Sequence, residues 1–290
     1  MEGKMLYSGK DLRKLIIPLI IEQILAIAVG MADTIMVSAA GEAAVSGVSL
    51  VDTVNILLIN VFSALATGGA VVSGHFLGKK KREDACKSAW QILLFATLLA
   101  FVISVIFITA HDPLLRLMFG KIEDDVMKAS KTYLIITTYS FVALAIYNSC
   151  AALFRAMNES KVTMWVSLLM NVINVVGNAI CIYGLHMGVA GVAIPTTISR
   201  YVAAVVIFLL MFQTKKEINL CGQITWKFNG SLIKKILYIA IPNGLENSMF
   251  QLGKILVMSA VATMGTSAIA ANAVTGTIAN WNNLPGFAIN

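Results

Sequence analysis

The sequence is poor in charge. Of its 290 residues only 13% are charged and 58% are hydrophobic, and the mean hydropathy is +0.81. A soluble domain carries about 25% charged residues, and a chain of this composition could not cover its core with a polar surface. The composition therefore excludes a soluble globular protein and predicts an integral membrane protein.

Cysteine and histidine are also scarce. The four cysteines show no CxxC or other metal-ligand spacing, and a cysteine within an apolar run is by default a packing residue. The three histidines lie at the ends of apolar runs, and no cluster of His and Asp has metal-ligand spacing. These absences argue against a membrane-embedded enzyme. We predict that the protein is not an enzyme and uses no cofactor.

Long apolar runs dominate what is present. A run of roughly 20 residues crosses about 30 Å as a helix. Such runs lie near 15–38, 47–77, 88–110, 132–154, 162–184, 189–212 and 236–264, and an eighth begins near 267. Only helices and closed barrels satisfy backbone groups in lipid, and these runs are too long and too evenly apolar for barrel strands. The predicted fold is an all-α, polytopic helical bundle.

The basic residues indicate the orientation of the bundle. The segment 1–14 and the loops 78–87, 155–161 and 213–235 together hold 16 Lys and Arg, whereas the opposite set of connections holds only four, all within 111–131. Positive charge stays on the cytoplasmic side, so we expect a cytoplasmic N-terminus in a multi-pass protein of the plasma membrane. The net charge of +7 is then a topology signal and not a nucleic-acid-binding surface.

The chain also contains an internal repeat. Pro18 and Pro242, Glu22 and Glu246, and Gly41 and Gly265 are each 224 positions apart, and the segments 15–47 and 239–271 align without a gap. Many secondary transporters are built from two such halves. We predict an N-lobe of six transmembrane helices over 1–212, a cytoplasmic linker over 213–235, and the start of a second, repeat-related lobe over 236–290. A complete second lobe would need about four more spans, so we expect the reading frame to continue.

Two acids lie in the first apolar run. Glu22 and Asp33 are eleven residues apart, which places them on nearly one helix face, about 16 Å apart along the axis. Glu22 is expected near the cytoplasmic end, where Arg13 or Lys14 could pair with it. Asp33 has no basic residue in its own run. Intramembrane carboxyls mark ion pathways, so we predict that Asp33 exchanges a proton or binds Na⁺ during transport.

Polar side chains mark two later runs. Asn171, Asn174 and Asn178 form one stripe of the fifth run, which fits either hydrogen bonding between helices or carbonyl oxygens turned toward a cation. The sixth run contains Pro195, Thr196 and Thr197. Because proline frees a backbone carbonyl beside two hydroxyls, this position suits an ion site or a kink.

The remaining intramembrane charges are open to two interpretations each. Arg200 could bind substrate or could pair with an acid such as Asp33 or Asp52 to hold helices together. Glu246 and Gln251 of the seventh run could face substrate or the interface between the lobes, and Glu246 could instead cap a helix end.

Several of these motifs resemble the multidrug and toxin extrusion (MATE) family of secondary transporters. The resemblance rests on Ile17-Pro18, on Ala32-Asp33-Thr34-Ile35-Met36-Val37 with Gly41, on Asn174-Val175-Val176-Gly177-Asn178, on Gly188-Val189-Ala190-Gly191-Val192-Ala193-Ile194 running into Thr196, and on Ile241-Pro242-Asn243-Gly244-Leu245-Glu246-Asn247. The order and spacing of these motifs extend over essentially the whole chain.

The resemblance implies a V-shaped pair of six-helix bundles that exports organic, often cationic, compounds in exchange for H⁺ or Na⁺. It implies that Asp33 couples transport to the ion, and that Asn174, Asn178 and Thr196 help to build the cation site. In one branch of the family the Asn178 position is an aspartate, and another branch has a glutamate where this chain has Phe250 or Gln251. Coupling is therefore expected to depend mainly on Asp33.

Two other function classes fit the sequence less well. A lipid-linked oligosaccharide flippase of the same superfamily would need a cavity rich in Arg and Lys, but the intramembrane basic residues here are Arg200 and Lys254. A membrane-embedded enzyme lacks a catalytic cluster. We therefore expect small organic substrates, contact with the lipid bilayer, no nucleic-acid partner, a monomeric state, and no metal other than Na⁺ at Asp33.

Overall fold

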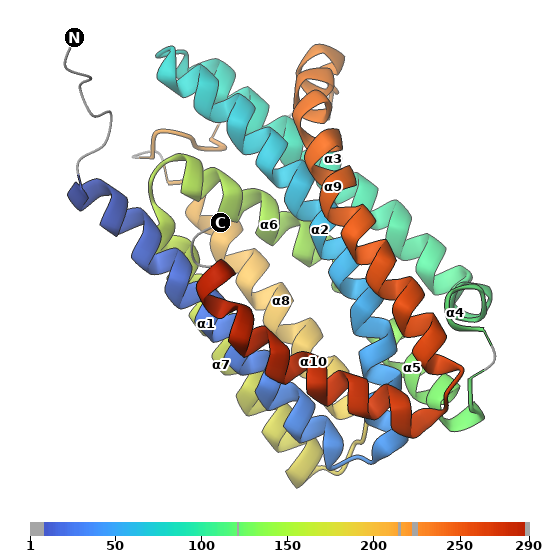
Figure 1. The fold of residues 1–290 in the computed structure, drawn as a ribbon. Coiled ribbons are helices and arrows are strands. Elements are labelled where there is room, and N and C mark those ends of the chain that lie inside the picture. Colours follow the sequence, from blue (N-terminus) through green and yellow to red (C-terminus); the bar gives the residue numbers. More distant parts are fainter. Residues whose placement is uncertain (1–8, 121, 214–215, 222–225, 288–290) are drawn as a thin grey trace.

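A computed structural model describes residues 9–120, 122–213, 216–221 and 226–287 (Figure 1). This described part folds into ten α-helices and one π-helical turn and contains no strand. The elements are α1 (Gly9–Ser38), α2 (Glu42–Gly78), α3 (Arg82–Thr109), α4 (His111–Phe119), α5 (Asp124–Thr138), α6 (Phe141–Ala156), α7 (Ser160–Ala179), η1 (Ile180–Gly184), α8 (Ala190–Leu210), α9 (Gly230–Ala262) and α10 (Thr266–Phe287). The predicted all-α bundle is confirmed.

Five helical segments are long and apolar enough to cross a membrane, or six if the bent pair α5 and α6 counts as one span, within the residues that the structure describes. They match the first six predicted runs. Helices α9 and α10 do not reach this hydropathy threshold, because each carries several Asn and Gln side chains and α9 also carries charged residues. Their role as spans seven and eight stays a prediction.

The fourth predicted run, 132–154, is not one straight helix. It is divided between α5 and α6, which are bent by 52°. The bend is lined by hydroxyls that bond to nearby carbonyls: Thr137 to Tyr133 at 2.8 Å, Thr138 to Leu134 at 2.6 Å and Ser140 to Thr137 at 2.6 Å. Such local bonds bend helices, and they explain a break that neither Gly nor Pro marks.

The sequence repeat is also a structural repeat. Helix α1 ends at Ser38 and α9 ends at Ala262, while α2 begins at Glu42 and α10 at Thr266, so both boundaries recur 224 positions later. Each break contains a glycine with positive φ, 104° at Gly41 and 98° at Gly265, a conformation that side chains other than glycine's rarely adopt. The predicted lobe boundary within 213–235 stays a prediction.

The two repeated helix pairs pack against each other. In Figure 1, α9 runs along α2, and α10 lies beside α1 and α2. A Cβ added to Gly68 on α2 would lie 2.6 Å from the Ile236 carbonyl oxygen of α9, so only glycine permits this approach. Small residues at helix crossings are typical of membrane bundles. Two side chains bond across the same surface: Ser46 to the Thr266 carbonyl at 3.0 Å and Gln251 to the Thr53 carbonyl at 3.1 Å.

The described part of the linker is fastened to the end of the bundle where α3 begins. Arg82 donates to the carbonyls of Lys216 at 2.7 Å and Glu217 at 2.9 Å. Gln91 donates to the Lys227 carbonyl at 2.9 Å and accepts from the Asn229 amide at 2.9 Å. The Asn229 side chain then caps α9. Within the described residues, side-chain contacts therefore hold the linker to the bundle at 216–217 and at 227–229.

Candidate functional site

A chain of hydrogen bonds connects three helices at the predicted coupling site. Asn178 Nδ2 of α7 donates to Asp33 Oδ1 of α1 at 2.6 Å and to Asn174 Oδ1 at 3.2 Å. Asn174 Nδ2 in turn donates to Thr196 Oγ1 of α8 at 2.9 Å. The four residues predicted from sequence as cation-binding side chains therefore lie together. Whether they bind an ion stays a prediction.

The sequence around Gly177 brings α7 and α8 close enough for this network. A Cβ added to Gly177 would lie 2.7 Å from Pro195 Cβ, so the glycine allows α7 to rest against the proline ring of α8. Gly177 lies between Asn174 and Asn178, and Pro195 directly precedes Thr196. The predicted asparagine stripe faces inward as a whole, because Asn171, Asn174 and Asn178 are all buried.

Two amide groups of the stripe have unused hydrogen-bonding capacity. Asn178 Oδ1 and Asn171 Nδ2 are buried and have no hydrogen-bond partner. An unsatisfied buried polar atom costs about 1–3 kcal/mol, and an ion would satisfy the Asn178 oxygen. Carboxylate, amide and hydroxyl oxygens suit hard cations such as Na⁺. No cluster of three or more His, Cys, Asp or Glu side chains that could hold a metal ion occurs in the described part of the chain.

Glu22 has partners among the described residues that the sequence did not predict. Its Oε1 accepts from Arg155 Nη2 of α6 at 3.0 Å, and its Oε2 accepts from Thr163 Oγ1 of α7 at 3.5 Å. The side chains of Arg13 and Lys14, the expected partners, lie outside the described residues. Glu22 is thus bound to helices distant in sequence, and it connects α1 to α6 and α7.

Arg200 does not form the predicted ion pair. Its Nη1 donates to Ser140 Oγ at the bend between α5 and α6, at 2.9 Å, and the ion pairs found within 4 Å among the described residues do not include it. It nevertheless lies close enough to Asp33 and Asp52 to interact with both electrostatically. The bend explains the difference, since it turns the Ser140 hydroxyl toward α8.

The two predicted residues of α9 are placed differently from each other. Gln251 is buried and bonds to the Thr53 carbonyl of α2, at the surface where the repeated helix pairs meet. Glu246 is exposed, and no hydrogen bond or ion pair joins it to another described residue. It lies in the interior of α9 and not at a helix end, so the predicted capping role is wrong.

Sequence reasoning missed Tyr133, Asn55 and Arg155 and gave Asp52 only as an Arg200 partner. Tyr133 Oη donates to Asp52 Oδ1 at 3.0 Å, and Asn55 Nδ2 donates to the same oxygen at 3.3 Å. Asp52 could have been found, because it is an acid inside an apolar run. Tyr133 gave no signal, since tyrosine is common near span ends.

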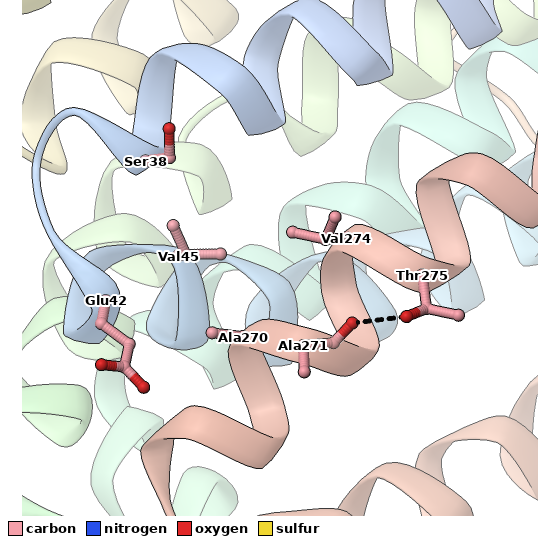
Figure 2. A pocket seen from close by; sticks show the side chains of 7 residues that line it. All are labelled: Ser38, Glu42, Val45, Ala270, Ala271, Val274 and Thr275. Atoms are coloured by element: carbon pink, nitrogen blue, oxygen red, sulfur yellow. Dashed lines mark hydrogen bonds between the residues drawn. The ribbon is translucent and has the colours of Figure 1, made fainter.

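An open pocket of about 550 Å³ lies away from this network (Figure 2). It is lined by the end of α1, the start of α2 and one face of α10, through Ser38, Glu42, Val45, Ala270, Ala271, Val274 and Thr275. One Thr275 bond is internal to α10, from its hydroxyl to the Ala271 carbonyl at 2.8 Å. None of the residues predicted for ion coupling contributes to the pocket.

A bundle of membrane-crossing helices with a half-buried, hydrogen-bonded carboxylate within one span is typical of a membrane transporter. The profile of the MatE family matches residues 18–180, more than half of the chain. The chain therefore belongs to the MatE family.

Known proteins agree with this assignment. The chain is 28% identical over 277 residues to the uncharacterized transporter YisQ of Bacillus subtilis, and 25% identical over 284 residues to a probable multidrug resistance protein NorM of Thermotoga maritima. These matches cover 94% and 97% of the chain and 60% of each relative. The chain therefore spans about 60% of their length.

A solved structure shows the same fold. The inward-facing conformation of a multidrug resistance MATE family transporter superimposes with a TM-score of 0.83 at 21% identity, over 95% of this chain and 62% of the other.

Proposed function

We propose that the chain forms the greater part of a cation-coupled antiporter that exports organic, often cationic, compounds by alternating access, with H⁺ or Na⁺ as the coupling ion. The observation that carries the proposal is the continuous hydrogen-bonded path from Asp33 through Asn178 and Asn174 to Thr196. It joins the carboxylate to two other helices, so a change of its charge must rearrange their contacts. The Thermotoga relative's name, a multidrug resistance protein, supports the substrate class.

The geometry gives the coupling step a physical form. With no ion bound, the Asn178 amide N–H group satisfies the Asp33 carboxylate at 2.6 Å. A proton or Na⁺ at Asp33 removes the need for that donor, and Na⁺ would favour a turned amide that offers Oδ1. Because the same Nδ2 also bonds to Asn174, the rearrangement passes to Thr196. Ion binding would thus alter how α1, α7 and α8 pack. This change would favour one of the two conformations of the alternating-access cycle, inward-facing or outward-facing, over the other.

The proposal also includes orientation and surroundings. Three connections meet at one end of the bundle, where the basic Lys216 pairs with Glu159 and the basic Arg82 bonds to the linker. This clustering supports a cytoplasmic location for that end, in a protein of the plasma membrane. We further propose that the transporter is monomeric and needs no cofactor beyond its coupling ion.

An exporter is preferred over a lipid-linked oligosaccharide flippase. A flippase needs cationic side chains free to hold pyrophosphate. Arg200 instead bonds to Ser140 and interacts with two aspartates, and Lys254 lies over the Phe250 ring with its Nζ 5.0 Å from the centroid.

The test is efflux of a fluorescent organic cation by cells expressing the complete reading frame that contains this chain. We expect Asp33→Asn to abolish gradient-driven efflux, and Glu83→Gln, an exposed acid of the cytoplasmic end, to leave it unchanged. Vesicles with the Na⁺ and pH gradients imposed separately would identify the coupling ion. Undiminished, gradient-dependent efflux by Asp33→Asn would overturn the proposal.

A further inference from the structure

Asp52 lies on α2, and it has its own set of polar partners. The Tyr133 hydroxyl and the Asn55 amide both donate to its Oδ1, at 3.0 and 3.3 Å. Gly47 makes this arrangement possible, because a Cβ there would lie 2.7 Å from Ala129 Cβ of α5. The close approach of α2 and α5 brings Tyr133 within reach of Asp52. The Tyr133 bond to Asp52 therefore depends on the packing of two helices, whereas the Asn55 bond lies within α2.

Three charged side chains interact in this part of the membrane. Asp33 interacts electrostatically with Asp52, and Arg200 interacts with both carboxylates. Arg200 is not within 4 Å of either acid as an ion pair and is held at Ser140, so it is a counter-charge common to both acids.

Several charged groups on the helices packed against α2 are engaged elsewhere. Glu22 of α1 pairs with Arg155 of α6, Lys87 of α3 pairs with Glu83, and Lys131 of α5 pairs with Asp112. Lys254 of α9 lies over the Phe250 ring, and α10 contains no charged residue. With both aspartates ionised, the group of Asp33, Asp52 and Arg200 therefore carries a net charge of −1.

Two buried amide oxygens point to a ligand in this group. Asn55 is 3% exposed and Asn178 is 0% exposed. Each donates its amide N–H to one of the two aspartates, and the Oδ1 of each has no hydrogen-bond partner. A net buried charge is costly, and so are unsatisfied oxygens. A monovalent cation bound beside the two aspartates would offset the net charge and would give such oxygens a partner.

We propose that Asp52 is the second carboxylate of the coupling site, and that Arg200 compensates one of the two negative charges so that the site takes up one monovalent cation per cycle. This inference rests on the proposed antiport function and deepens it. A second acid on α2 gives the site two carboxylates although position 178 is an asparagine. The role of Arg200 is to set the charge that the coupling ion must balance.

The test is binding of ²²Na⁺ to the purified product of the complete reading frame in detergent, together with proton uptake at constant Na⁺, for six proteins. We expect the unaltered chain to bind one cation. Asp52→Asn makes the group neutral and should weaken binding roughly tenfold or more. Arg200→Gln leaves a charge of −2 and should raise either the affinity or the number of cations bound. The double variant Asp52→Asn, Arg200→Gln returns the charge to −1 and should recover single-cation binding.

Recovery in the double variant separates this role from a purely structural one, since two structural losses would add. Arg200→Lys keeps the charge and should behave like the unaltered chain, which identifies a folding defect in Arg200→Gln if one occurs. If the unaltered chain binds neither cation, the proposed coupling itself fails. If it binds one cation, Asp33→Asn abolishes binding and Asp52→Asn does not weaken it, this inference alone is wrong.

Discussion

Replacing Gly177 with alanine tests whether the site depends on the close approach of α7 and α8. The new Cβ would lie 2.7 Å from Pro195 Cβ and 3.2 Å from its Cγ, whereas carbon atoms in contact lie about 3.5–4.0 Å apart. The proline ring cannot rotate away, because it is closed onto its own backbone. The two helices must therefore separate locally by about 1 Å.

The size of the effect follows from three contributions. Overpacking costs about 1–3 kcal/mol. A separation of about 1 Å would stretch the Asn174–Thr196 bond from 2.9 Å beyond the range of a hydrogen bond, which costs about 1 kcal/mol more. Alanine's higher helix propensity offsets up to about 1 kcal/mol. We expect a net loss of about 1–3 kcal/mol.

The measurement is thermal unfolding of the purified chain in detergent, with Na⁺ and with choline at equal ionic strength. Gly253→Ala on α9 is the matched control, because no atom lies within 4 Å of its added Cβ. We expect Gly177→Ala to unfold at a lower temperature than Gly253→Ala and to lose any stabilisation by Na⁺. Equal unfolding temperatures with equal Na⁺ responses would show that the site does not need this helix contact.

Two further predictions concern contacts outside the coupling site. Glu22→Gln removes the ion pair with Arg155 and should lower the free energy of unfolding by about 1–2 kcal/mol in chemical denaturation. The control Glu83→Gln, which removes an exposed pair with Lys87, should leave the denaturation midpoint unchanged. Equal effects would refute a specific role for the Glu22 pair. Gln91→Leu removes the side-chain bonds to the Lys227 carbonyl and the Asn229 amide and should speed tryptic cleavage after Lys227. The control Gln213→Leu, at an exposed position, should not change the cleavage rate. Unchanged cleavage of Gln91→Leu would mean that other contacts hold the linker.

The sequence predicted elements well where one local pattern decided them. Apolar runs located α1, α2, α3, α7 and α8, and the spacing of Asn171, Asn174 and Asn178 predicted one inward face. The 52° bend between α5 and α6 was not predicted, because hydroxyl-to-carbonyl bonds and not Pro or Gly mark it. The position and angle of such a bend cannot be predicted from the local composition alone.

The sequence identified the polar residues within the spans more readily than it identified the residues that they bond to. The sequence did not indicate Arg155 as a partner of Glu22, because the two residues are 133 positions apart. An acid was one expected partner of Arg200, and the buried Ser140 at the unpredicted bend accepts its hydrogen bond instead. Intramembrane charges are therefore readily identified from sequence, whereas their pairing depends on helix packing that a single sequence does not specify.

The repeat shows that the acids of the proposed coupling site occur in only one half of the described bundle. At the constant spacing of 224, the positions equivalent to Asp33 and Asp52 are Val257 and Gly276, so neither acid has a counterpart on α9 or α10. Those helices contact the site through backbone groups: Gln251 bonds to the carbonyl of Thr53, the residue next to Asp52, and the Thr266 carbonyl accepts from Ser46. A shift of α2 driven by the charge on Asp52 would therefore move the carbonyl that Gln251 holds. Since the same helix carries an acid of the site on one face and packs against α9 through Gly68 on another, α2 is the element through which ion binding in the first half would reach the second.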